Sequence, residues 1–174
     1  MRILWLSLVL LFNFQPKHER LVILEKNITV AGTTSLGKFE CIYNVEGLKD
    51  TLIFENNTSS TSFLFEIPVN DFACGNFLLN NDFRKTIKAK QYPKAQVKVT
   101  RLRRGKTLYQ CDLFLDIAGK KLIFRDFELT QLDKKLMGNL LLSFDALELE
   151  APNKLGGLVK VDEVLSLSLS ILYQ

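Results

Sequence analysis

The side chains that most often carry catalysis are sparse in this sequence. His18 is its only histidine and lies close to the N-terminus, which excludes a histidine-based triad and a zinc site of three histidines. Two pairs of carboxylates, Asp126 with Glu128 and Glu148 with Glu150, stand two residues apart. On a strand each pair would share one face, so a two-carboxylate hydrolysis is conceivable. The alternative, which we favour, is a charged outer face in contact with water.

Other catalytic motifs are missing as well. The sequence has no Gly-x-Ser-x-Gly elbow, no phosphate-binding glycine loop and no dinucleotide fingerprint. We therefore expect a protein that is not an enzyme, with no catalytic residues, no metal and no cofactor.

The three cysteines, Cys41, Cys74 and Cys111, lack the close pairing of a zinc or redox motif. Cys111 has the parity of the apolar residues Tyr109 and Leu113, which predicts a buried, reduced thiol. In an exported protein this leaves Cys41 and Cys74 as a candidate disulfide, with two free thiols as the alternative.

The N-terminus resembles an export signal. Arg2 precedes an apolar run of 12 residues, Ile3 to Phe14, which is broken only by Ser7 and Asn13. A membrane-spanning helix needs about 20 apolar residues, whereas a signal core needs roughly 7–15. We therefore predict a signal in residues 1–20, one domain over residues 21–174, and a periplasmic or secreted location. A buried N-terminal strand or helix is the alternative.

The rest of the chain alternates apolar and polar residues with a period of two, as half-buried strands do. The pattern is clearest in Leu165 to Ile171 and recurs in Phe63 to Val69, Cys111 to Ile117 and Leu140 to Phe144. Turn-forming residues separate these runs, which is typical of an antiparallel sandwich or barrel.

Two segments depart from simple alternation. Between Lys120 and Leu132 the apolar parity changes after Phe124, which predicts a β-bulge. One helix is expected where Phe83 and Ile87 fall at helical spacing, with Asn80 or Asn81 as its cap and Tyr92-Pro93 at its end.

Charge is unevenly distributed. The segment from Arg84 to Lys106 holds ten basic residues and no acidic one, although the net charge of the chain is only +4. Such a segment could contact an anionic membrane surface or form a solvated face. Nucleic-acid binding is not expected, because Tyr92 is the only aromatic residue that interleaves with these charges before Lys106.

The high content of 13 Phe suits a large apolar interior. An eight-stranded barrel either fills its interior with side chains or holds one small ligand. Composition alone favours the filled interior.

Several segments, in their order and spacing, resemble the YceI-like family over about residues 28–172. They are Val30 to Thr34 with Phe39 to Cys41, Val69 to Asn76, Asn81 to Lys85, Ile87 to Pro93, Cys111 to Lys121, Leu142 to Leu147 and Gly157 to Val164. The family's His-Ser opening strand is absent, and Ala118-Gly119 replaces its usual charged residue before the glycine.

The resemblance implies an all-β fold, an eight-stranded antiparallel lipocalin-like barrel with one short α-helix. It also implies an isoprenoid or fatty chain in the pore, an exported carrier or sequestering role, and occasional homodimers. A barrel with a filled core that acts as an interaction or stress-response module is the alternative. From parity we predict that the pore is lined by Phe65, Ile67, Val97, Val99, Leu113, Leu115, Ile117, Leu140, Leu142, Leu167 and Leu169.

Overall fold

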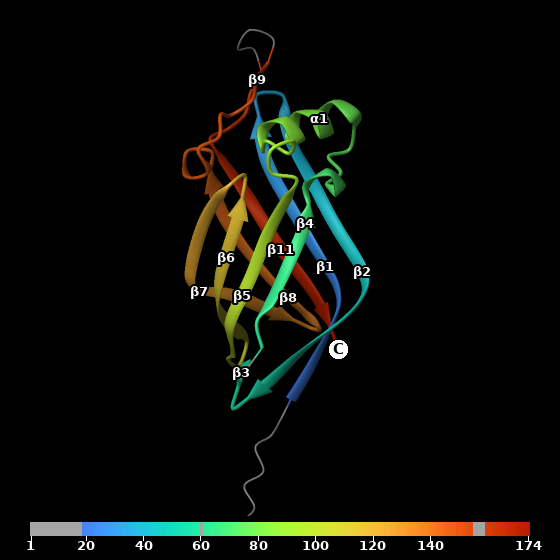
Figure 1. Cartoon of the computed structure of the whole chain (residues 1–174), viewed down its shortest axis with the longest axis vertical. Helices are drawn as coiled ribbons and strands as arrows, with labels where there is room; N and C mark the ends of the chain where they lie inside the picture. The colour runs from blue at the N-terminus through green and yellow to red at the C-terminus, as the bar shows by residue number, and fades with distance from the viewer. Residues whose placement is uncertain (1–18, 60, 155–158) are drawn as a thin grey trace, which may run out of the picture.

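The structure, a computed structural model, describes residues 19–59, 61–154 and 159–174. Eight long antiparallel strands form a closed barrel, which confirms the predicted fold (Figure 1). They are β1 (Glu19–Thr34), β2 (Gly37–Glu55), β4 (Phe63–Pro68), β5 (Lys94–Arg104), β6 (Leu108–Ile117), β7 (Lys120–Leu132), β8 (Lys135–Ser143) and β11 (Val164–Tyr173). The predicted signal, residues 1–20, lies outside the described residues except for Glu19 and Arg20. These two residues already pair with β2, so the barrel begins two residues before the predicted domain.

The strand order is β3-β2-β1-β11-β8-β7-β6-β5-β4, and the two-residue strand β3 (Thr58–Ser59) also pairs with β5, which closes the ring. A separate two-stranded ribbon, β9 (Asn153–Lys154) with β10 (Val159–Lys160), lies beyond the barrel end. Two single 3-10 turns, η1 (Val69–Asp71) and η2 (Asp145–Leu147), follow β4 and β8.

The barrel wall is not hydrogen-bonded evenly all round. β7 and β8 are paired with each other only between Thr130–Leu132 and Lys135–Met137. Over the rest of their length these two strands are not paired with each other. β2 meets β3 only at Phe54 and Glu55. Nearer the opposite end, Ile42 and Ala73 exchange two backbone hydrogen bonds of 2.9 Å. The wall can therefore widen between β7 and β8 without breaking ladder hydrogen bonds.

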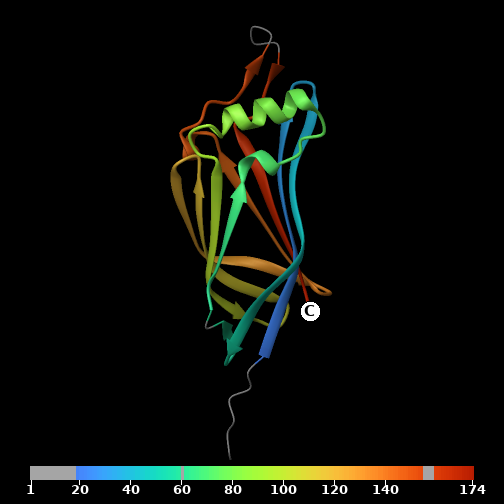
Figure 2. The ribbon, with the colours of Figure 1, turned by 45° about the vertical axis from the view of Figure 1, so that its right-hand side comes forward.

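One short helix, α1 (Phe77–Thr86), lies across one end of the barrel (Figure 2). Its cap is Asn76, whose side chain accepts a hydrogen bond of 2.9 Å from the Leu79 amide, so the predicted caps Asn80 and Asn81 were wrong. The Asn80 side chain instead accepts from the Cys74 amide at 2.6 Å and fastens the preceding loop. The helix also ends before the predicted Tyr92-Pro93, because turns occupy residues 87–91.

The change of parity predicted in β7 is confirmed as a bulge. Residues 125 and 126 of β7 both stand opposite Asp112 of β6, which lets Phe124 and Phe127 point into the barrel. β5 has a matching irregularity between Thr100 and Arg103 on the other side of β6. The two irregularities stand opposite adjacent residues of β6, Cys111 for β5 and Asp112 for β7.

The half of the barrel far from α1 is solidly packed. Tyr109, Leu102, Leu129, Leu136 and Ile171 are each at most 1% exposed and fill its interior. In the part of the chain that the structure describes, no helix is long and apolar enough to cross a membrane.

Candidate ligand site

The end of the barrel beneath α1 contains a cavity of about 110 Å³. The helix contributes Leu79 and Phe83, and β1 contributes Val30. No residue of α1 is fully buried. The helix is therefore a lightly packed cover over an apolar space.

Two further cavities continue this space into the barrel. The middle one, of about 60 Å³, shares Val30, Phe83 and Leu165 with the cavity beneath α1. The inner one, of about 10 Å³, shares Ile28, Val97 and Leu167 with the middle one. We call these three contiguous cavities the apolar tract. It runs from α1 toward the packed half of the barrel.

Nine of the eleven predicted lining residues border the tract. These are Ile67, Val97, Leu113, Leu115, Ile117, Leu140, Leu142, Leu167 and Leu169. Phe65 and Val99 point inward and are each 1% exposed, but they lie outside the three cavities. Contact of any of the eleven with a ligand stays a prediction.

Sequence reasoning missed much of the upper lining. The residues that it missed there come from β1, from η1 and its flanks, from α1 and from the segment around η2. They include Ile28, Val30, Val69, Phe72, Leu79, Phe83, Leu147 and Leu149. The helical spacing of Phe83 and Ile87 was the one usable signal, because it marked an apolar helix face that needs a partner.

A groove on the outside of the barrel follows the unpaired part of β7 and β8. It is lined by Leu122, Phe124 and Val164 among others, and Leu141 beside it is 71% exposed. Leu142 borders both this groove and the middle cavity. The gap in the hydrogen-bond ladder thus lies next to the apolar tract.

Cys41 of β2 and Cys74 form a disulfide, while Cys111 is a buried free thiol. Cys41 borders the cavity beneath α1, and Cys74 stands two residues before the helix cap Asn76. The disulfide therefore attaches the approach to α1 to the barrel wall. Burial raises the pKa of the Cys111 thiol to about 12.

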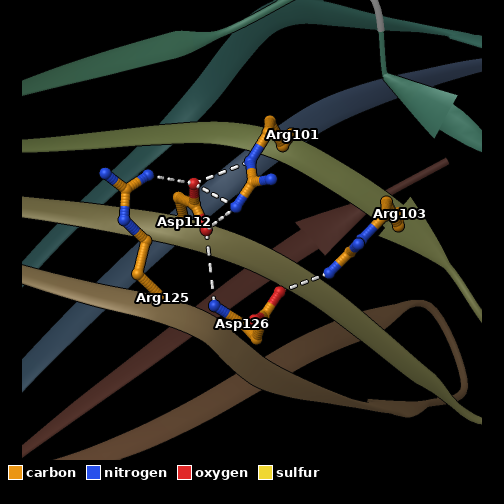
Figure 3. A network of polar contacts seen from close by, with 5 residues as sticks. All are labelled: Arg101, Arg103, Asp112, Arg125 and Asp126. Carbon is orange, nitrogen blue, oxygen red and sulfur yellow. Dashed lines mark hydrogen bonds and ion pairs between the residues drawn. The ribbon is translucent and has the colours of Figure 1, made fainter.

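Over the described ranges of the chain, four of the ten basic residues in the predicted basic segment form ion pairs with acidic neighbours. Lys94 pairs with Glu66 at 2.9 Å, Arg101 with Asp112 at 2.6 Å, and Arg104 with Glu19. Arg103 pairs with Asp126 at 2.5 Å (Figure 3). The membrane contact predicted for Arg84 to Lys106 stays a prediction.

The carboxylate pairs considered for catalysis are also engaged in ion pairs. Asp126 holds Arg103, and Glu148 holds Lys120, whose side-chain hydrogen bond lowers the Glu148 pKa. Among the residues that the structure describes, no group of three His, Cys, Asp or Glu side chains is placed to bind a metal ion. The apolar tract is suited to the burial of an apolar molecule.

Comparison with solved structures agrees with this geometry. A polyisoprenoid binding domain from Saccharophagus degradans, implicated in plant cell wall breakdown, matches with a TM-score of 0.55 and 13% identity over 92% of this chain and 99% of that one. The chain has the fold of this domain. The YceI-like resemblance seen in the sequence is thereby confirmed for the fold.

Two further solved structures are similar to this barrel with lower TM-scores. BcnA from Burkholderia cenocepacia has a TM-score of 0.47 and 16% identity over 82% of this chain and 95% of that one. The YceI protein of Campylobacter jejuni has a TM-score of 0.44 and 14% identity over 60% and 71%. No protein-family model and no curated protein matches the sequence.

Proposed function

We propose that this YceI-like barrel binds a long apolar or amphipathic chain, of isoprenoid or fatty type, in the apolar tract. The observation that carries the proposal is a succession of three cavities that share lining residues and are bordered almost wholly by aliphatic and aromatic side chains. Burial of each methylene group contributes roughly 0.8 kcal/mol, so a chain of this kind can bind without specific hydrogen bonds. The polyisoprenoid binding domain of the same fold supports this choice of ligand.

The cavities are small for a long chain, so binding requires the barrel to expand. Two features supply the room. α1 covers the tract with Leu79 and Phe83, and Ile87 follows directly after the helix; none of the three is fully buried. The wall beside Leu142 has no ladder between β7 and β8. We infer that the chain enters by displacing α1 and pressing these strands apart.

We further propose that the protein acts as a carrier or sequestering protein outside the cytoplasm. The Cys41–Cys74 disulfide supports this location, because disulfides persist in oxidising compartments. The apolar run Ile3 to Phe14 supports it as a signal core.

A filled-core interaction module is the second candidate function. The dense packing of Tyr109, Leu102 and Ile171 favours it, because half of the barrel offers no space for a ligand. Such a module would bind no lipid in its interior.

Native mass spectrometry of freshly purified protein separates the two functions. The carrier should show an added lipid mass, and Leu115→Trp or Leu142→Trp should abolish it, because each indole would fill part of the tract. Leu64→Trp is the matched control, since Leu64 of β4 is 53% exposed and borders neither the tract nor the groove along β7 and β8. Absence of lipid from wild type, or unchanged lipid in both inward variants, would refute the carrier function.

A further inference from the structure

A buried lysine stands at the inner end of the apolar tract. The pairing of β1 shifts register between Ile23 and Glu25, and after this bulge Lys26 shares the inward face of β1 with Ile28. Lys26 is only 8% exposed and lies in register with Val45 on β2 and Ile171 on β11. The bulge therefore turns a charged side chain into the barrel.

The ammonium group of Lys26 crosses the interior to an aromatic ring. Its Nζ lies 4.1 Å from the ring centroid of Phe65, an inward residue of β4 that is 1% exposed. The Phe65 ring also packs against Phe63, with 4.9 Å between centroids. Within the described parts of the chain, no hydrogen bond or ion pair is made by Lys26. Burial lowers its pKa, and the more distant charge of Asp50 opposes this shift.

This placement is energetically unfavourable for the empty barrel. Burying an ammonium group without a paired anion is costly, and a cation–π contact returns only part of that cost. Apolar side chains of similar volume usually serve stability as well or better at such positions. A buried charge kept without a partner therefore points to a partner that arrives with the ligand.

The apolar tract leads to this charge. Ile28, two residues from Lys26 on the same face, borders both the middle and the inner cavity. Val97, which pairs with Phe65, borders the same two cavities. Lys26 and Phe65 border none of the three cavities and lie next to their lining, so a chain that extends past the inner cavity would end beside the Lys26 ammonium group.

We propose that Lys26 binds the anionic head group of the ligand, and that this group is the carboxylate of a long-chain fatty acid lying head-inward in the barrel. The proposal rests on the proposed lipid-binding function and specifies its ligand class. A carboxylate is favoured over a phosphate because its single charge matches the one ammonium group, whereas a phosphate monoester carries about −1.5 to −2 at neutral pH. On binding, the ammonium group exchanges the face of Phe65 for a charge-assisted hydrogen bond.

The test compares two probes of equal chain length, hexadecanoic acid and hexadecan-1-ol, on the delipidated full chain at neutral pH. Calorimetric titration gives the Kd of each. A buried charged hydrogen bond should make the acid bind at least about tenfold more tightly than the alcohol. Lys26→Met should abolish this preference, leave the alcohol's Kd within about threefold, and leave the melting temperature equal or higher.

Lys98→Met is the control, because Lys98 is an exposed lysine on β5, and it should keep the preference for the acid. A preference that persists in Lys26→Met would overturn the role of Lys26. Equal binding of acid and alcohol by wild type would overturn it too, while leaving the lipid-binding function intact. Binding of neither compound would refute the lipid-binding function and this inference with it.

Discussion

Asp112 of β6 accepts two hydrogen bonds from the guanidinium group of Arg101 on β5, from Nε and Nη2, both at 2.7 Å (Figure 3). The same carboxylate accepts from Nη1 of Arg125 at 2.6 Å and from the backbone amide of Asp126 at 3.3 Å. Its side chain is only 2% exposed. One carboxylate of β6 therefore connects the irregularities of β5 and β7, the two strands on either side of β6.

These irregularities determine which side chains enter the barrel. Arg101 and Asp126 both adopt positive φ, at 51°, which an L-residue does at some cost. The extra residues let Leu102 and Leu129 follow Val99 and Phe124 on the inward face. The Asp112 interactions thus stabilise the bulged conformation of β5 and β7 that places Leu102 and Leu129 in the core.

Replacing Asp112 with Asn should destabilise the barrel. The amide keeps the shape of the carboxylate but leaves Arg101 and Arg125 without their shared anion. We expect the melting temperature to fall by at least about 5 °C, because the buried side chain at this position loses charge-assisted hydrogen bonds from two arginines. Thermal unfolding followed by circular dichroism measures this. Glu128→Gln is the control, because Glu128 is an exposed residue of β7, the strand that also carries Arg125. It should change the melting temperature by less than about 2 °C.

The Asp112 interactions should also make stability depend on acidity. The hydrogen bonds from Arg101, with those from Arg125, hold the Asp112 pKa well below its ordinary value in the folded protein. Unfolded Asp has a pKa of about 3.9, so the stabilisation is complete above about pH 5 and is lost as the pH falls below that value. Denaturant titrations at several pH values should show a shallower acid dependence for Asp112→Asn than for wild type. Equal slopes would contradict the assignment.

Much of the barrel could be predicted because its strands alternate strictly. Leu165 to Ile171 is inward-facing at every second residue in the β8–β11 pairing, and the parity change in β7 was enough to predict its bulge. Each inward residue is then fixed by the period of two. For the same reason most of the predicted lining borders the apolar tract.

The remaining features depend on contacts between distant segments. Lys26 escaped notice because residues 21–24 are all apolar, so the change of parity across the bulge in β1 cannot be read from the sequence. Phe65 and Val99 have the predicted inward parity, but they border none of the three cavities. The extent of the cavities along the barrel depends on the packing of α1 and of the core at the other end, which parity does not reveal. The helix cap was misplaced because Asn76, Asn80 and Asn81 are equally good caps, and only the loop's hydrogen bond to Asn80 distinguishes them.

The disulfide should contribute strongly to stability. Cys41 and Cys74 close a loop with a sequence separation of 33, for which the loss of chain entropy corresponds to about 3–4 kcal/mol. The double variant Cys41→Ser, Cys74→Ser should lose this much free energy of unfolding in denaturant titrations. Wild type under reducing conditions should behave like the variant. A loss below about 1 kcal/mol would contradict a strong contribution of the disulfide to stability.

The free thiol should be inert while the protein is folded. Cys111 is 1% exposed, and burial raises its pKa to about 12, so thiolate is scarce at neutral pH. Because the thiolate is the reactive form, an aromatic disulfide reagent should modify native protein about a thousandfold more slowly than unfolded protein. Without reductant, denatured wild type should release a single equivalent of thiol chromophore. Rapid reaction of the native protein would contradict the burial of Cys111.

Gly138 should be irreplaceable at the inner cavity. A Cβ at this position of β8 would lie 2.6 Å from the Phe127 ring and 2.7 Å from a Leu129 methyl carbon, so both side chains would have to move. We expect Gly138→Ala to lower the free energy of unfolding by about 1–3 kcal/mol, as overpacking usually does.

The same variant should also change ligand binding, because Gly138 and Phe127 both border the inner cavity. Relative to wild type, it should lose more affinity for long chains than for short ones. Asn139→Ala is the control on the exposed side of the same strand, and it should leave both quantities close to wild type. A stable Gly138→Ala variant with unchanged chain-length preference would show that the inner cavity does not receive the ligand.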